Sequence, residues 1–584
     1  MNILSASTRP RTGTQSSVQE VAFKRDHIDD YLQVPAFKHV LSHGDRPMLA
    51  LPAALHNSMI VLGVESKQFF VLCLEQEFRS NEWFNLIEQG KRMNMVFAGA
   101  YTCSPDILQT LLQEHVLEKT ATQAQKALEH ERETISKIIQ DSAPLGWLNG
   151  IVAHCLQLGS SDIHFEVRGD VTLLRVRRDG LMRLVKHLPS RMVISGLSAG
   201  YTVLAQEGSS SEVAFNAGLP QSAMIPMDVH GQKLQLRYQS HPSVSGFDAT
   251  IRILRTGKVS HDDLPKIDKL GYTPWQVEQL RETTQSAWGG VFIAGITGSG
   301  KTTTLSALLS MLASQGQRKI ISIEDPVEYI VPGVSHFSIQ RQAKDSTHNP
   351  FESAMMSFLR MDPDVGMFGE IRDRLSAQMA HSAIQTGHKL LTTVHATSAL
   401  GIVARLTSQN IGLLREDVCN AEFLSMLAYQ VLMPLNCPHC KVRAISVLPV
   451  QTLVDYEKYF GLDVAMLRCA SDAGCSHCQV PGLEAISNSH AGVKGVKVCA
   501  EVLALDNTLL QLLHQGDDLG ARNHWLGLRQ SGFDKEDMVG KEAWGHALYD
   551  MSQGRIDPFH FERTFGSPAV IARTRQLKPM VGGA

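Results

Sequence analysis

The sequence lacks an excess of either charge and lacks any long hydrophobic run. Its 55 Lys and Arg residues against 58 Asp and Glu residues give a formal net charge of -3, so no global positive field favours nucleic acid as a direct partner. The absence of any run of about eighteen apolar residues argues against a membrane-spanning helix. The first residues are rich in Ser, Thr and Gln, and no apolar segment follows them. We therefore expect a disordered lead-in over residues 1–22, no secretory signal and a cytoplasmic location.

Cysteine is also sparse, with 10 residues in a chain of 584. Four of them form two CxxC pairs, at Cys437, Cys440, Cys475 and Cys478. In a chain without an export signal, grouped cysteines indicate a metal site more often than disulfides, and two such pairs supply a closed tetrahedral thiolate site for zinc. His439 and His477 lie inside the pairs and are second-choice ligands. The other cysteines show no pairing pattern, as is typical of buried core residues. We predict a structural zinc site.

Length and composition predict several domains. With 43% hydrophobic and 19% charged residues, a chain of this size forms about three or four domains. The stretch 207–226, rich in Ser, Gly and Pro, predicts a mobile loop. The expected parts are an N-terminal domain at 23–116, a helical linker at 117–142, a second domain at 143–258, a third at 264–505 with a zinc module at 437–478, a helical region at 506–565 and a tail at 566–584.

An apolar strand at residues 291–294 runs into a complete phosphate-binding loop, and a helical pattern follows it. Backbone N–H groups of such a loop and the positive end of the helix wrap phosphates, Lys301 reaches the outer phosphates and the Thr302 hydroxyl holds Mg²⁺. The expected nucleotide-binding residues are Gly295, Thr297, Gly298, Ser299, Gly300, Lys301, Thr302 and Thr303. We predict that the chain binds a nucleoside triphosphate.

The surrounding sequence alternates between strand and helix patterns, which predicts a doubly wound α/β sheet. The expected strands are Val291–Ala294, Lys319–Ile323, Asp364–Phe368 and Lys389–Val394, with a helix at Leu375–Gln385. Ligands of such sheets gather at the carboxyl ends of the strands. Polar residues fall there, namely Glu324, Asp325, Glu328, Glu370 and His395.

Glu370, expected one residue past a buried strand, is a candidate for orienting or deprotonating the attacking water. The aspartate that commonly precedes it is absent, because position 369 is glycine. Magnesium would then depend on Thr302, the phosphates, water and a carboxylate of the turn 324–328. Taken singly, each acidic residue fits a helix cap or a solvated loop equally well. Their joint placement at strand ends favours a site.

Four ordered motifs give the sequence a resemblance to a family. Segments Gly295–Thr302, Ile323–Tyr329, Asp362–Asp373 and Thr386–His395 resemble the Walker A, Asp box, Walker B and His box of the type II secretion and type IV pilus ATPases. Upstream, Ser161–Glu166 and Arg175–Gly180 are similar to the second N-terminal domain of that family. The CxxC pairs match the zinc module of its assembly-type members. The resemblance covers roughly residues 143–505.

This resemblance implies a RecA-like ATPase domain preceded by a smaller, PAS-like α+β domain and by a docking domain. It implies Glu328 as the Asp-box carboxylate near Mg²⁺, Glu370 as the water-activating residue and His388 with His395 as the His-box pair. In the family two arginines of the second N-terminal domain reach the nucleotide, and their setting matches Arg237 and Arg252. The guanidinium fork suits that task because it stabilises charge on the transferring phosphoryl group.

The resemblance further implies a homo-hexamer that hydrolyses ATP at the inner membrane. There it would act on a platform protein and bind a membrane-associated docking partner, to drive type IV pilus assembly or type II secretion. Two departures, Thr397-Ser398 after the His box and the loop Leu219–Ala223, suggest a divergent branch. A retraction motor, a nucleic-acid translocase of a conjugation system and a nonhydrolysing nucleotide-dependent scaffold remain alternatives. Retraction motors typically lack the zinc module and a long N-terminal region, and a translocase would be stimulated by DNA.

Overall fold

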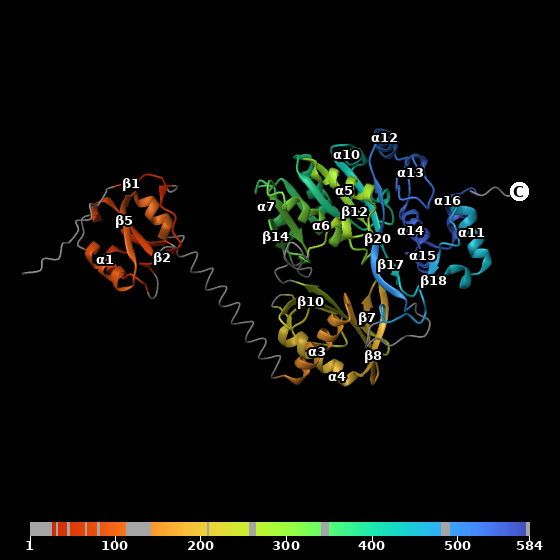
Figure 1. The fold of residues 1–584 in the computed structure, drawn as a ribbon, viewed down its shortest axis with the longest axis horizontal. Coiled ribbons are helices and arrows are strands. Elements are labelled where there is room, and N and C mark those ends of the chain that lie inside the picture. Colours follow the sequence, from red (N-terminus) through yellow and green to blue (C-terminus); the bar gives the residue numbers. More distant parts are fainter. Residues whose placement is uncertain are drawn as a thin grey trace, which may run out of the picture. The chain divides into compact units, whose positions relative to one another are not determined.

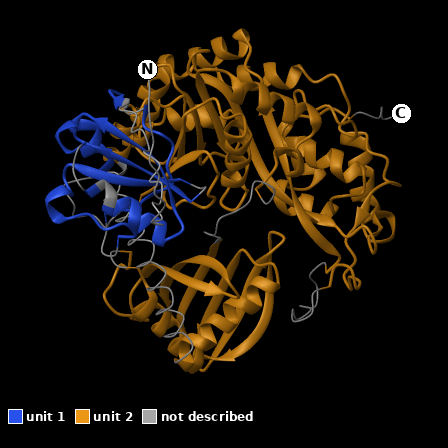
Figure 2. Ribbon diagram, turned by 60° about the vertical axis from the view of Figure 1, so that its left-hand side comes forward, with its two compact units in different colours: residues 1–135 blue, residues 136–584 orange. Residues whose placement is uncertain are grey.

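The computed structural model describes residues 26–30, 33–43, 47–64, 67–78, 82–112, 142–206, 209–255, 264–339, 350–479 and 491–579. The expected lead-in and nearly all of the expected linker lie outside these residues. The chain divides into two compact units, Met1–Ile135 and Ser136–Ala584 (Figure 2). None of the described helices combines the length and the apolar character that a membrane span requires.

Unit 1 is built on a mixed sheet with the strand order β1-β5-β4-β3-β2. Its elements are β1 (Asp26–Ile28), β2 (His39–Val40), η2 (Ala53–Leu55), β3 (Met59–Val64), β4 (Gln68–Cys73), η3 (Glu75–Glu77), α1 (Glu82–Arg92) and β5 (Val96–Cys103). The central strands are apolar on both faces, so alternate residues enter different cores: Val61 and Val71 pack on one side, Ile60 and Leu72 on the other. Unit 1 therefore has hydrophobic cores of its own.

The second domain opens unit 2 with an antiparallel sheet in the order β8-β7-β6-β11-β10-β9. Its elements are α3 (Ala143–Gln157), β6 (Asp162–Arg168), β7 (Val171–Arg178), β8 (Leu181–Pro189), α4 (Ser190–Leu204), β9 (Gln221–Val229), β10 (Gln232–Ser243) and β11 (Gly246–Arg255). Helices α3 and α4 pack on each other and against the sheet (Figure 1). The loop prediction for 207–226 is wrong at its end, because residues from Gln221 onward are paired with β10.

The third domain contains the sheet β14-β13-β15-β16-β12-β17-β20, parallel except for β20 at its edge. Its strands are β12 (Gly289–Ala294), β13 (Ile320–Glu324), β14 (Val334–Ser338), β15 (Val365–Ile371), β16 (Lys389–Val394), β17 (Leu424–Asn436) and β20 (Val493–Leu503). Its helices are η4 (Ile267–Lys269), α5 (Pro274–Gln285), α6 (Lys301–Ala313), α7 (Pro350–Phe358), α8 (Arg374–Gln385), α9 (Gly401–Leu406) and α10 (Arg415–Val418).

The central strands of this sheet are buried on both faces, which explains why β12, β13 and β16 are nearly continuous apolar runs. Val291 and Ile293 of β12 pack with α5 and α6 on one face. Phe292 and Ala294 pack with α7, α8 and α9 on the other. The predicted α/β alternation is confirmed, with one difference: Glu370 lies inside β15, where the pairing with β16 shifts register, and does not follow the strand.

Most of the C-terminal elements surround a further core at the ends of β17 and β20. They are β18 (Val442–Arg443), η5 (Ala444–Ser446), α11 (Val450–Phe460), β19 (Arg468–Cys469), α14 (Ala543–Ser552), α15 (Pro558–Phe565) and α16 (Pro568–Arg575). Helices α12 (Asn507–Gln515) and α13 (Asp518–Gly527) instead pack in the core of the third-domain sheet, with α7, α8 and α9. The tail expected from residue 566 is thus folded up to α16, which packs against α11 and buries Ile571.

A buried carboxylate of α14 pairs with a lysine of β20 and with an arginine that follows the helix. The Asp550 carboxylate is inaccessible to solvent and lies 2.5 Å from Lys497 Nζ and 2.7 Å from the Arg555 guanidinium. His546, one helical turn earlier and equally buried, accepts a hydrogen bond at Nδ1 from the Ala500 backbone N–H at 3.1 Å. Two cations already neutralise the carboxylate, so this cluster is a cross-link between helix and sheet and a poor site for a metal cation.

Candidate nucleotide and metal sites

The phosphate-binding loop follows β12 and ends where α6 begins at Lys301. Gly298 and Gly300 have φ values of +77° and +81°, in the left-handed region that favours glycine. A Cβ on Gly295 would overlap the Ser299 side chain and lie 2.5 Å from the carbonyl oxygen of Gln430. The Lys301 ammonium donates to the Gly295 and Ile296 carbonyl oxygens at 2.9 and 3.2 Å. Lys301 therefore already lies across the loop that would hold phosphates.

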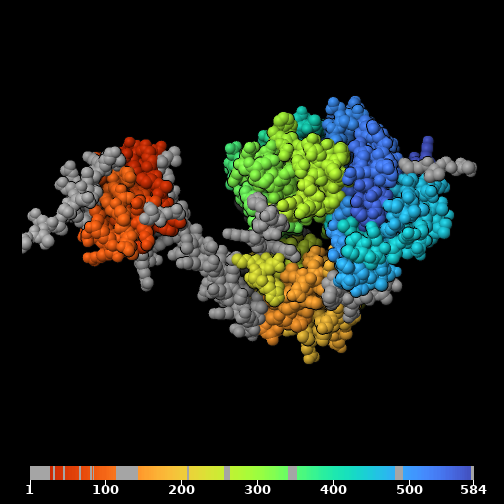
Figure 3. All heavy atoms as spheres, viewed as in Figure 1, coloured from red at the N-terminus to blue at the C-terminus, as the bar shows by residue number. Residues whose placement is uncertain are grey.

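A cleft of about 1660 Å³ opens at this loop, between the second and third domains of unit 2 (Figure 3). The predicted site residues that line it are Thr297, Gly298, Ser299, Gly300, Lys301, Thr302, Thr303, Glu328, Glu370, His395, Arg237 and Arg252. They come from the loop, from the carboxyl ends of β13, β15 and β16 and from β10 and β11. Burial lowers the pKa of Lys301, and the carboxylates of Glu370 and Glu328 act in the opposite direction.

Glu370 is held by two basic side chains. His395 Nε2 lies 3.0 Å from Oε1, and Arg372 Nε lies 2.6 Å from Oε2. Arg372 also reaches the Asp325 carboxylate at 3.8 Å. Each carboxylate oxygen of Glu370 therefore has one basic partner and keeps a lone pair with which it can accept a hydrogen bond from a water molecule.

The turn after β13 separates two carboxylates that the sequence left as alternatives. Glu324 is buried, and its Oε1 accepts the Ser322 hydroxyl at 2.7 Å and lies 3.2 Å from His336 Nδ1. Glu328 instead hydrogen-bonds the Thr302 side chain; burial raises its pKa, while Arg252 and that hydrogen bond oppose the rise. Carboxylate and hydroxyl oxygens are ligands that Mg²⁺ accepts. The pair Thr302 and Glu328 fits such an ion, whereas Glu324 is committed elsewhere.

Arg237 and Arg252 are direct partners on the neighbouring strands β10 and β11. Side chains opposite each other in an antiparallel pair project from the same face, and both arginines lie near enough to Glu328 to lower its pKa. Arg252 Nε also donates to Asp162 Oδ1 at 2.9 Å. The second domain therefore presents two adjacent guanidinium groups to the cleft.

The structure does not bring His388 into the cleft. His388 precedes β16 whereas His395 follows it, and the six residues of this strand separate them by about 20 Å. The His388 ring lies 2.9 Å from Thr386 Oγ1 and 3.0 Å from the Ala383 carbonyl oxygen, and it packs on Phe358. These contacts lie at the C-terminal end of α8, away from the phosphate site.

One residue that holds the phosphate-binding loop in place was not identified from the sequence. Gln430 on β17 is fully buried and donates its side-chain amide to the Ser299 carbonyl oxygen at 2.7 Å. The available signal was an uncharged polar residue in the middle of a mainly apolar strand, since such a residue needs a buried partner.

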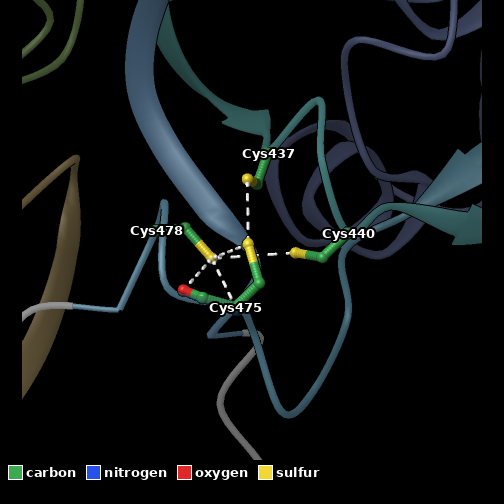
Figure 4. Close-up of side chains that lie close together, drawn as sticks. All are labelled: Cys437, Cys440, Cys475 and Cys478. Atoms are coloured by element: carbon green, nitrogen blue, oxygen red, sulfur yellow. Dashed lines mark hydrogen bonds between the residues drawn. The ribbon is translucent and has the colours of Figure 1, made fainter.

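The four predicted zinc ligands converge at the ends of β17 and β20 (Figure 4). Sulfur–sulfur distances are 3.8 Å for Cys437–Cys475 and 3.7 Å for both Cys440–Cys478 and Cys475–Cys478. Zinc–sulfur bonds of about 2.3 Å in a tetrahedron separate the sulfurs by about 3.8 Å. The residues present therefore fit a tetrahedral metal, and the distances are far too long for disulfides. The His477 backbone N–H lowers the pKa of Cys475 to about 6, which favours the thiolate.

His439 and His477 do not complete this site. Their rings are exposed and stack on each other, with centroids 3.8 Å apart and an angle of 14° between the planes. The sulfurs alone form the tetrahedron.

The model of a family described as type II/IV secretion system protein matches residues 139–535. The chain belongs to this family. It is 30% identical over 411 residues to type II secretion system protein E of Dickeya dadantii, covering 69% of this chain and 75% of the relative. It is 28% identical over 406 residues to the type IV pilus assembly ATPase PilB of Thermus thermophilus, covering 68% of this chain and 42% of the relative. The solved Legionella pneumophila ATPase DotB, at 18% identity and a TM-score of 0.47 over 71% of this chain and 93% of DotB, is too distant to carry an argument.

Proposed function

We propose that this secretion family member is an ATPase motor of a type II secretion or type IV pilus assembly machine. It would act as a homo-hexamer in the cytoplasm, at the inner membrane, and move a platform protein. The observation that carries the proposal is the meeting of the phosphate loop with Glu328, Glu370, Arg237 and Arg252 in one cleft. Relatives named as type II secretion ATPase and pilus assembly ATPase support it.

Each residue has a chemical task in this proposal. Lys301 would exchange its two carbonyl partners for the outer phosphates. Thr302 and Glu328 would hold Mg²⁺, which would supply charge neutralisation at the phosphate oxygens. Glu370 orients the attacking water through a remaining lone pair of its carboxylate, while His395 and Arg372 hold that carboxylate in place. Arg237 and Arg252 stabilise the charge of the transferring phosphoryl group. Because the arginines come from the second domain and the phosphate loop from the third, hydrolysis requires the two domains to come together. This requirement couples hydrolysis to their relative movement.

We further propose that the four thiolates hold zinc and that unit 1 is the docking domain for a membrane-associated partner. A closed four-sulfur site offers no open coordination position, so the metal would be structural. It would tie segment 437–478 to the sheet. The cysteine cluster and the N-terminal unit both favour an assembly or secretion motor over a retraction motor.

The test is steady-state ATP hydrolysis by the full chain across protein concentration, with and without single- and double-stranded DNA. Activity that rises with ring assembly and ignores DNA is the expected result. Strong stimulation by DNA would contradict the proposal and indicate a nucleic-acid translocase.

Lys301→Ala should lose ATP binding, because the loop loses the lysine expected to contact the outer phosphates.

Glu370→Gln should bind ATP but lose turnover by about 10²-fold or more, since the amide cannot accept the proton. His388→Gln is the matched control, because His388 lies at the opposite end of β16 and should keep most of its turnover. An equal loss of turnover in the two variants would show that His388 takes part in hydrolysis in the assembled hexamer, although it lies outside the cleft here.

A further inference from the structure

Gln430 connects the phosphate-binding loop to the neighbouring strand. It lies on β17, directly beside β12, and none of its surface is exposed. Ala428 and Val431 of the same strand are apolar and buried. An amide in such a place costs free energy unless its polar atoms are bonded, and both ends of the Gln430 amide are.

The two ends of this amide are oriented unambiguously by their partners. Nε2 donates to the Ser299 carbonyl oxygen at 2.7 Å, and Oε1 accepts the Tyr272 hydroxyl at 2.6 Å and the Thr304 hydroxyl at 3.1 Å. Burial raises the pKa of Tyr272, so its hydroxyl remains a donor. Tyr272 lies ahead of α5 and Thr304 lies in α6, so the amide of β17 ties both the segment before α5 and helix α6 to the loop.

The bonded carbonyl belongs to the peptide between Ser299 and Gly300. In a planar trans peptide the C=O of one residue and the N–H of the next point in opposite directions. With the Ser299 carbonyl drawn toward β17, the Gly300 N–H is turned away from β17, toward the open side of the loop. Backbone N–H groups on that side are the ones that bind phosphate oxygens.

We infer that Gln430 is a positioning residue for nucleotide binding, which fixes the Ser299–Gly300 peptide so that its N–H faces the phosphates. The inference rests on the proposed function. Tyr272 holds the amide in the required orientation by occupying Oε1. The hydrogen bond from Gln430 to Ser299 also connects the phosphate site directly to β17, the strand that leads to the cysteine cluster at its C-terminal end.

The test measures the dissociation constants of ADP and ATP for the full chain by calorimetry in the presence of Mg²⁺. Gln430→Glu removes the N–H donor and places a carboxylate against the Ser299 carbonyl, so affinity should fall about ten- to hundredfold. Tyr272→Phe keeps the ring and removes one donor, and affinity should fall by a smaller factor of about two to ten.

Gln276→Glu is the matched control. Gln276 is equally buried in the same domain, donates to the Ala500 carbonyl oxygen at 2.7 Å and accepts from the Thr273 N–H at 3.1 Å, away from the loop. Its replacement should lower the thermal midpoint without changing nucleotide affinity.

Three outcomes decide between the inference and the function on which it rests. Weaker binding in the Gln430 and Tyr272 variants, relative to Gln276→Glu, supports the inference. Unchanged affinity in Tyr272→Phe together with equal affinities in Gln430→Glu and Gln276→Glu would overturn it and leave the ATPase proposal standing. Absence of nucleotide binding by the unaltered chain would overturn both. If Gln430→Glu does not fold, Tyr272→Phe alone decides.

Discussion

At the residue scale, the phosphate-binding loop is fixed by close contacts as much as by its backbone angles. Gly298 and Gly300 need the left-handed region, but Gly295 does not have a positive φ. Its constraint is space, since the Ser299 side chain and the Gln430 carbonyl oxygen occupy the volume that a Cβ would need. The loop therefore needs glycine for two different physical reasons: a left-handed backbone at Gly298 and Gly300, and a lack of space for a side chain at Gly295.

Gly295→Ala should weaken ADP binding by at least tenfold and lower the free energy of unfolding by about 1–3 kcal/mol, because a methyl group would push β17 and the loop apart. Isothermal titration and urea unfolding measure the two effects. Gly150→Ala is the control, because Gly150 is exposed in α3 with no atom near its Cβ position; it should be neutral or slightly stabilising. Unchanged ADP binding in Gly295→Ala would contradict the steric argument.

His546 gives a residue-scale prediction about pH. Burial lowers its pKa to about 4, against a partial opposing effect of Asp550. The folded state therefore keeps a neutral ring, which its hydrogen bond from the Ala500 N–H also requires. Because the folded pKa is below the unfolded value near 6.5, the contribution is fully present above pH 6.5. It is lost as the pH falls toward 4, by about 3 kcal/mol in all.

Thermal midpoints measured between pH 7 and pH 4.5 check this expectation. The midpoint of the unaltered chain should fall more steeply than that of His546→Gln, which lacks the titrating group. His187→Gln, at an exposed position on β8, should behave as the unaltered chain does. Parallel pH curves for all three proteins would count against a buried neutral His546.

At the element scale, the strands that the sequence predicted correctly are those with a local pattern of their own. The strands β12, β13, β15 and β16 are apolar runs followed by polar residues, and the parallel sheet brings those residues to one edge. Contacts between distant segments carry no such local pattern. The Gln430 bond to Ser299, the pairing of β9 with β10 and the packing of α16 on α11 are of this kind.

Local geometry set a second limit on prediction. The register shift of β15 after Phe368 extends the strand through Glu370, which no hydrophobic pattern indicates. His388 and His395 are close in sequence and share one motif, yet a strand between them carries them to opposite edges of the sheet. Spacing along the chain is therefore a poor guide to distance when an extended segment intervenes.

The cysteine cluster gives an element-scale prediction about metal removal. Segment 437–478 shares a core with α14 and α15, through Tyr456, Phe460 and Phe561, while β12 and α6, which flank the phosphate loop, pack in a separate core. Chelation of the metal, or Cys440→Ser, should lower the thermal midpoint strongly because metal binding stabilises only the folded site. ADP affinity should change little.

Zinc content by atomic absorption and ADP titration test this separation. Cys419→Ala, at a buried cysteine outside the cluster, is the control and should retain the metal. A purified chain without metal but with the full thermal midpoint would show that the four sulfurs do not form a structural zinc site.

At the scale of the whole molecule, folding and chemistry divide between the units. Unit 1 packs around its own cores, and all of the described residues that we assign to the nucleotide and metal sites belong to unit 2. A chain of residues 136–584 should therefore bind ADP with the affinity of the full chain. Calorimetry on the two proteins measures this, and a tenfold difference would show that unit 1 contributes to the site.

A metal held by the cysteine cluster would also affect how quickly the sheet edge forms. Pro434 of β17 pairs with Val496 of β20, so the unfolded chain must close a loop of about 60 residues to begin this pairing. A metal bound by Cys437 and Cys475 leaves only about 24 residues of that path free. Loop-closure entropy then falls by about 1 kcal/mol, which corresponds to roughly fourfold faster encounter of the two strands. A metal bound during synthesis would therefore favour early pairing of β17 with β20 as well as the final stability of this edge.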